Sequence, residues 1–138
     1  MENNLLFFIE IFLLLFIVVF FLVIWKIKRR KLSASVVVKI VQDFYRIQSI
    51  PQNNLKILEA DKLLDFVLKK SGYTQPSLGE KLKKAGSRFS DLSGLWGAHK
   101  LRNRIAHEVN FQLNNKETNL ALRQFARAFE DLGVNIQK

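Results

Sequence analysis

The sequence predicts an all-α protein with one N-terminal transmembrane helix followed by an antiparallel bundle of four to five helices. Three observations support this. The 21 residues Leu5–Trp25 are apolar apart from Glu10, and apolar side chains in the remainder recur at three- and four-residue steps. No segment alternates apolar and polar residues with the period of two of a strand. The 138 residues are enough for one small helical domain beside this appendage.

The segment Leu5–Trp25 is predicted to be a membrane anchor. A helix of that length spans roughly 30 Å, the thickness of a hydrocarbon core. A cleaved signal peptide would begin with basic residues and would have small residues after its apolar run. This chain begins Met-Glu-Asn-Asn, and Lys, Ile and Arg follow its apolar run. We therefore expect a single-pass protein of the cell (plasma or inner) membrane.

Charge predicts the orientation of that anchor. All 22 Lys and Arg residues lie at or after Lys26, and a basic cluster, Lys26–Lys31, follows the apolar run. The positive-inside rule then predicts a short extracytoplasmic terminus (residues 1–4), with residues 26–138 in the cytoplasm. Leu5–Trp25 and the basic cluster are the expected contacts with membrane lipids. The basic cluster is the first part of a basic linker of residues 26–35.

The net charge of +10 suits an anionic partner, either phospholipid or nucleic acid. The chain has no cysteine, so disulfides and thiolate metal sites are excluded. It has two histidines and no tight carboxylate cluster, and we expect neither a metal nor a cofactor.

Five helices are predicted in the soluble domain (residues 36–133), which precedes a short tail (residues 134–138). Ser33 or Ser35 can cap the first, Pro51 and the pair Asn53-Asn54 end it, and Gly72 ends the second. Pro76-Ser77 opens the third, and Asp91 or Ser93 introduces the fourth. The expected spans are about 36–48, 55–71, 78–85, 95–109 and 117–132. An alternative for the first is that it continues the anchor helix.

The spacing within these helices predicts which side chains are buried and which are solvated. The last helix should bury Leu120, Ala121, Phe125, Ala128, Phe129 and Leu132. Asp61 and Asp65 are expected at a solvated edge of the second helix, although a pairing between a carboxylate there and Arg102 would fit the charge pattern. The run Lys81, Lys83, Lys84 and Arg88 is expected to be a solvated basic face, or a phosphate track if RNA binds. Trp96 is expected in the core or a dimer interface.

The helix around residues 95–109 is the candidate functional element. It carries both histidines of the chain, and His99, Asn103 and His107 follow one another at four-residue steps. Arg102 and Arg104 flank this polar stripe. Imidazole can transfer protons near neutral pH, and guanidinium suits a phosphate whose charge grows in a transition state. These groups suffice for metal-free RNA cleavage, and equally for binding RNA or a nucleotide without cutting it.

The stretch Arg102-Asn103-Arg104-Ile105-Ala106-His107 resembles the R-N-x-x-x-H form of the R-x4–6-H motif of HEPN domains. These are small all-α domains of toxin–antitoxin, defence and RNA-processing proteins. The resemblance covers roughly residues 36–133 and excludes the anchor. It implies that Arg102 contacts phosphate, that His107 transfers protons and that Asn103 orients a motif side chain or the RNA. It also implies a homodimer with two motifs facing one shared cleft, metal-independent endoribonuclease activity, and an antitoxin or other protein as a partner.

Other interpretations stay open. His99, Lys100 and Arg104 lie outside the motif and are expected at most to make flanking substrate contacts. Many HEPN domains bind without catalysis, so the chain could be a membrane-tethered interaction or nucleotide-binding module. It could also be a helical scaffold whose polar stripe is inert.

Overall fold

The computed structural model describes residues 2–28 and 31–136, with side chains described for residues 7–24 and 31–136. It is all-helical in these residues, with no strand. Met1, residues 29 and 30 of the basic cluster and residues 137–138 of the tail lie outside the described residues, as do the side chains of Trp25 and of residues 26–28. The chain divides into two compact units, one up to Lys31 and one from Leu32 onward.

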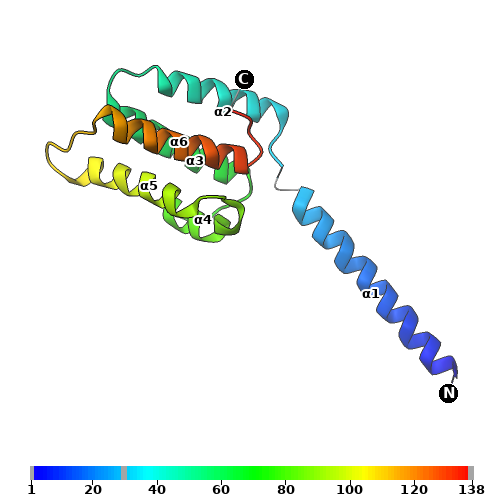
Figure 1. Ribbon diagram of the computed structural model, residues 1–138. Helices are drawn as coiled ribbons and strands as arrows, with labels where there is room; N and C mark the ends of the chain where they lie inside the picture. Colours follow the sequence, from blue (N-terminus) through cyan, green and yellow to red (C-terminus); the bar gives the residue numbers. More distant parts are fainter. Residues whose placement is uncertain (1, 29–30, 137–138) are drawn as a thin grey trace. The chain divides into compact units, whose positions relative to one another are not determined.

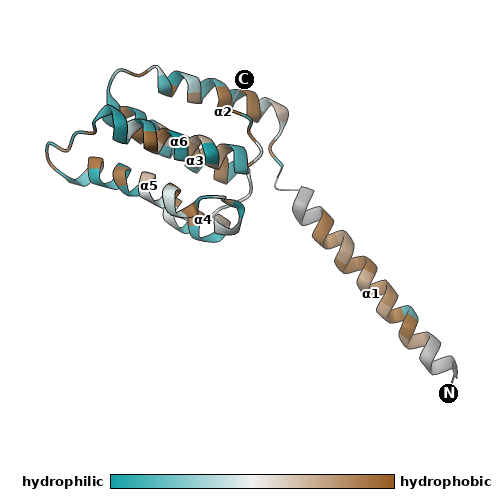
Figure 2. Cartoon of the chain, viewed as in Figure 1, coloured by the Kyte–Doolittle hydropathy of each residue, from teal (hydrophilic) through white to brown (hydrophobic). Residues whose placement is uncertain are grey.

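The first unit contains one helix, α1 (Glu2–Lys28), which is long and apolar enough to cross a membrane. Its 18-residue segment Phe7–Ile24 has a mean hydropathy of 3.3, and none of that segment is buried within the protein. Figure 2 shows the helix hydrophobic along nearly all of its coloured length. A side-chain surface of this kind, exposed on all sides, is what a lipid-facing helix presents.

The second unit contains five α-helices and one 3-10 turn within its described residues. Figure 1 shows the four longer helices side by side, each running opposite to the preceding long one, with the short α4 at one end. The elements are α2 (Ala34–Gln48), α3 (Asn53–Lys70), α4 (Leu78–Ala85), η1 (Gly86–Arg88), α5 (Leu92–His107) and α6 (Asn115–Asp131).

Local sequence signals explain most of these boundaries. Ser77 caps α4 and Asn114 caps α6, each through a capping box with the glutamate three residues later, Glu80 and Glu117. Gly72, which follows α3, has a φ of +89°, a backbone conformation open to glycine without strain. The predicted span 78–85 agrees with α4.

Other boundary predictions were wrong. α2 is not continuous with α1, because residues 31–33, which precede α2, are not helical. Ser33 occupies the N-cap position of α2, yet its side chain makes no capping hydrogen bond. Asn53 and Asn54 do not precede α3 but form its first turn, where their amides bind the loop after α5.

The core is centred on α3, which packs against α2, α5 and α6. Ile57, Leu64, Val67 and Leu68 of α3 are fully buried, and each such side chain contributes about 1.5–3 kcal/mol. Across the domain, the Phe44 and Phe129 rings meet edge-to-face with centroids 5.4 Å apart.

The predicted core of α6 is confirmed with one exception. Ala121, Phe125, Ala128, Phe129 and Leu132 are buried, whereas Leu120 is 46% exposed and Leu122 is buried instead. Leu122 lies two residues beyond Leu120, on the side of α6 where it shares a pocket lining with Gln48 of α2 and Lys56 of α3. Helical spacing alone does not determine which sides of α6 the other helices cover.

Candidate functional site

Helix α5 begins at a side-chain cap and is held close to α6. Asp91 Oδ1 accepts a hydrogen bond from the Gly94 amide at 2.8 Å, as expected for an N-cap. A Cβ at Gly94 would lie 2.5 Å from Asp91 Oδ2 and 2.6 Å from Gln124, so any larger residue would displace these two side-chain ends. Leu95 and Ala98 face the core, which turns the polar positions of α5 toward α3 and outward.

Asp61 of α3 is the centre of the polar contacts made by α5. Its Oδ1 lies 2.8 Å from His99 Nδ1, and its Oδ2 lies 3.3 Å from Arg102 Nε. The carboxylate is buried, with a side-chain exposure of 6%. An ionised carboxylate only accepts hydrogen bonds, so it fixes the proton of His99 on Nδ1. The expectation that Asp61 lies at a solvated edge was therefore wrong, and the alternative of a pairing with Arg102 is confirmed.

One turn further along α3, the carboxylate of Asp65 also pairs with a side chain of another helix. Its Oδ1 accepts a hydrogen bond from Lys81 Nζ of α4 at 2.6 Å. Lys81 is 5% exposed, which contradicts its placement on a solvated basic face, whereas Lys83 and Lys84 are exposed as predicted. Burial of the Lys81 stem against the core is possible because Asp65 supplies the counter-charge for its ammonium group.

Trp96 covers the imidazole of His99. The two rings meet edge-to-face with centroids 5.8 Å apart, and the indole also packs over Gly79 at the start of α4. Trp96 is partly buried against the core, in agreement with the expectation of a core position. Together with Asp61 it leaves His99 with a side-chain exposure of only 12%.

In the R-N-x-x-x-H stretch of α5, Arg102 and Asn103 are partly buried, whereas His107 is exposed. The Arg102 side chain is 36% exposed, and its Nη1 donates a hydrogen bond to Asn103 Oδ1 at 3.3 Å. His107, the last residue of α5, is exposed and makes no hydrogen bond or ion pair with any residue that the structure describes. Arg102 and His107 share a helix, but no hydrogen bond or ion pair joins them within the part of the chain that the structure describes.

Arg104 belongs to a separate cluster at the end of α5. Its guanidinium donates from Nε and Nη2 to the two carboxylate oxygens of Glu108, at 2.8 and 3.1 Å. It also lies over the Phe111 ring, 4.1 Å from the centroid. The hydrogen bond to Glu108 raises the pKa of Arg104, and the same bond lowers the pKa of the Glu108 carboxyl.

The loop that follows this cluster is fixed by α3. Asn54 donates to the Phe111 carbonyl at 2.6 Å and accepts from the Leu113 amide at 3.0 Å. Asn110, in the same loop, has a φ of +59°, which asparagine tolerates better than most residues. The backbone beyond His107 is thus held in place even though Val109 is 89% exposed.

The two remaining predicted contacts differ in environment. Lys100 is exposed and unpaired within the described residues, whereas His99 is enclosed by Asp61 and Trp96. Among the side chains that the structure describes, no group of three or more His, Cys, Asp or Glu is arranged to hold a metal ion.

Asp61 was not among the predicted site residues, although the sequence contained a signal for it. It follows Ile57 by four residues and precedes Leu64 and Leu68 by three and seven, so it lies on the buried face of α3. A carboxylate within an apolar stripe requires a buried partner.

No family model, no curated protein and no solved structure matches this chain. The family resemblance therefore rests on the α5 motif and on the order of the helices around it.

Proposed function

We propose that this chain is a membrane-anchored HEPN-like domain that binds RNA through the exposed side of α5 and cleaves it as a homodimer without a metal ion. We place the domain on the cytoplasmic face of the cell membrane, where α1 and the basic cluster would retain it. The observation that carries the proposal is the Asp61–Arg102 ion pair, which holds one side of a motif arginine against α3.

This contact leaves part of the guanidinium for a ligand. Asp61 engages Nε of Arg102, and Nη1 contacts Asn103, yet the side chain remains 36% exposed. An arginine anchored in this way is pre-oriented, so a phosphate meets a fixed pair of donors at a small entropic cost. Asp61 would then act as a positioning residue.

The chemistry assigned to the pair is a transesterification within RNA. A base removes the proton of a 2′-hydroxyl, whose oxygen attacks the adjacent phosphorus, and the 5′-oxygen leaves with a proton from an acid. The products are a 2′,3′-cyclic phosphate and a 5′-hydroxyl. His107 has a free imidazole suited to proton transfer, and Arg102 would stabilise the charge on the phosphoryl oxygens.

A homodimer would supply the second accessible imidazole that one chain lacks. Proton transfer to and from the two oxygens requires two groups on opposite sides of the phosphorus, and each protomer offers one accessible imidazole, that of His107. Two motifs facing a common cleft would provide both.

Cleavage of a labelled RNA by the full chain in non-ionic detergent, with EDTA present, tests the proposal. Substitutions Arg102→Ala and His107→Ala should each reduce the rate by about 100-fold or more. Arg46→Ala, which removes an exposed guanidinium from α2, is the control for lost charge. RNA that stays intact, or cleavage that persists in both motif variants, would refute the catalytic proposal.

A second comparison decides which histidine is involved. His99→Asn keeps a side-chain amide that can donate to Asp61 but removes the imidazole. If His107 is the proton-transfer group, His99→Asn should stay within about tenfold of the wild-type rate. A larger loss in His99→Asn than in His107→Ala would assign the chemistry to the Asp61–His99 pair instead.

A further inference from the structure

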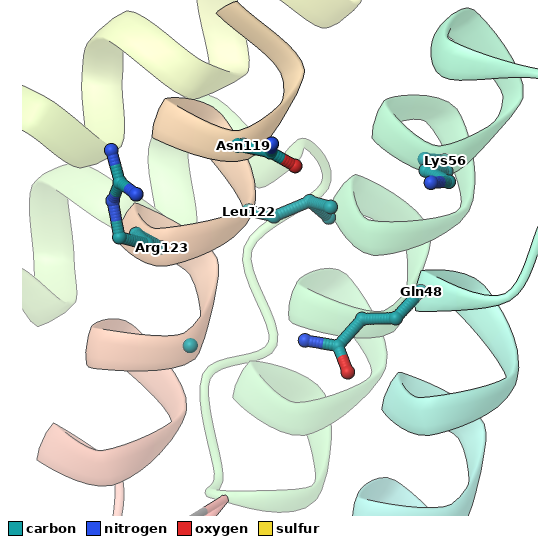
Figure 3. A pocket seen from close by; sticks show the side chains of 6 residues that line it. Gln48, Lys56, Asn119, Leu122 and Arg123 are labelled. Carbon is teal, nitrogen blue, oxygen red and sulfur yellow. The ribbon is translucent and has the colours of Figure 1, made fainter. Parts of the chain in front are cut away.

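A pocket that α5 does not line carries two cationic side chains that form no ion pair with any residue the structure describes. It has a volume of about 320 Å³ and lies where the end of α2 and the start of α3 meet one face of α6. Figure 3 shows it from close by. No residue of α5 belongs to its lining, which consists of Gln48, Lys56, Asn119, Leu122, Arg123 and Ala126.

The ionisable residues of this lining are both cationic. Lys56 is partly buried and Arg123 exposed, and neither makes an ion pair with any residue that the structure describes. By contrast, the pocket between α2 and α3 balances its cations Lys39, Arg46 and Lys62 with the carboxylates of Asp43 and Glu59. A partly buried ammonium without a carboxylate partner favours an anion from outside the chain.

Two amides add neutral donors to the same space. In Figure 3, Asn119 of α6 and Gln48 of α2 both point into the pocket. Neither side chain makes a hydrogen bond with another described residue, so both N–H groups are available. The guanidinium of Arg123 is turned away in this view, but its stem lines the pocket and a change of rotamer can bring the charge over it.

The backbone of α3 adds to the positive potential. Gln52, at the N-cap position of α3, makes no capping hydrogen bond, and the first turn of the helix contains no acidic residue. The partial positive charge of this helix end is therefore uncompensated, and Lys56 lies one turn from it.

The two remaining lining residues, Leu122 and Ala126, are apolar. Leu122 is almost fully buried, and Ala126 packs partly against the core beside it. From the two cations, the two amides and this apolar surface, we propose that the pocket binds a phosphomonoester on a small organic body, of the size of a mononucleotide. The phosphate would lie near Lys56, with the organic body on Leu122.

Titration of the full chain in dodecyl maltoside micelles with AMP, inorganic phosphate and adenosine tests this. AMP should bind saturably and more tightly than phosphate, and adenosine at least about tenfold more weakly than AMP, because it lacks the charged group. A short-chain phosphatidic acid and glycerol 3-phosphate form a further arm, in which tighter binding than AMP would assign the phosphomonoester to a lipid headgroup. Adenosine that binds as tightly as AMP, or AMP that does not saturate, would overturn the proposal.

Substitutions in the pocket lining test whether AMP binds in this pocket. Lys56→Gln with Arg123→Gln should weaken AMP binding by about tenfold or more, and Arg123→Gln alone by less. Lys69→Gln, an exposed cation of α3 outside the pocket, is the matched control and should leave binding unchanged. Arg102→Ala should also leave it unchanged, which separates this pocket from the proposed RNA site on α5. AMP binding that survives the double variant, or that is lost in Arg102→Ala, would refute the assignment.

Discussion

The Asp61 carboxylate contacts His99 and Arg102 together, although 38 residues separate Asp61 from His99. Two side chains of α5, one turn apart, are thereby attached to a single buried group of α3. Because burial removes the carboxylate from water, its two partners must replace the lost hydration. The position of the motif arginine is consequently coupled to the packing of α3 against α5.

Asp61→Asn should destabilise the domain by about 1–3 kcal/mol, because a neutral amide replaces the charged acceptor of Arg102 and His99 must change its tautomer to accept a hydrogen bond from the amide N–H. Thermal or urea unfolding of the full chain in detergent, followed by circular dichroism, measures the loss.

Asp43→Asn is the control for Asp61→Asn. Asp43 pairs with Lys39 and Arg46 on the exposed surface of α2, and such pairs contribute about 0.3–0.5 kcal/mol each. Equal losses in the two variants would show that Asp61 is no more important than a surface carboxylate.

Two glycines of α5, three residues apart, should respond in opposite directions to alanine. At Gly97 a Cβ meets nothing within 4 Å, so Gly97→Ala should stabilise the domain by up to about 1 kcal/mol through helix propensity. At Gly94 a Cβ would displace Gln124 and the Asp91 cap, which Arg127 also holds, so a net loss of about 1–3 kcal/mol is expected.

Unfolding midpoints of the two glycine variants are compared with that of the wild type. Stabilisation by Gly94→Ala would mean that α5 and α6 lie further apart than described.

The Arg104–Glu108 pair should lose its effect in acid. The pKa of Glu108 is lowered from its ordinary value of 4.5 by the hydrogen bond from Arg104. A carboxylate with a lowered folded-state pKa stabilises above its unfolded value, and this stabilisation is lost as the pH falls through the folded value. The raised pKa of Arg104 has the opposite sign, and its effect on stability lies at strongly alkaline pH, outside the working range.

An NMR titration of the Glu108 carboxyl carbon measures this shift. In Arg104→Gln the pKa of Glu108 should return toward 4.5, since the charged donor is gone. An unchanged titration in that variant would show that the pair does not form in solution.

Local signals allowed much of the fold to be predicted from the sequence, while the centre of the site required the assembled domain. Ser77 caps α4 where predicted, because a capping box depends on residues only three positions apart. Helical spacing alone gives no information on which element covers a side chain, so it predicts a solvated basic face for Lys81 and a solvated edge for Asp61, with the pairing to Arg102 as the alternative. Their burial results from the approach of α5 and α4 to α3. The position of His107 at the end of α5 follows from the local sequence. The proposed role of His107 depends on the surface of a second protomer.

Asn54→Ala should loosen the loop between α5 and α6. The Asn54 amide satisfies both the Phe111 carbonyl and the Leu113 amide, so its removal leaves two backbone groups without their partner. We expect a loss of about 1–3 kcal/mol. Hydrogen exchange at Leu113 should accelerate in this variant while exchange in the centre of α3 changes only with global stability. Asn119→Ala, whose side chain makes no hydrogen bond within the described residues, is the matched control and should leave Leu113 protected. Equal protection of Leu113 in both variants would show that α3 does not hold the loop that follows His107.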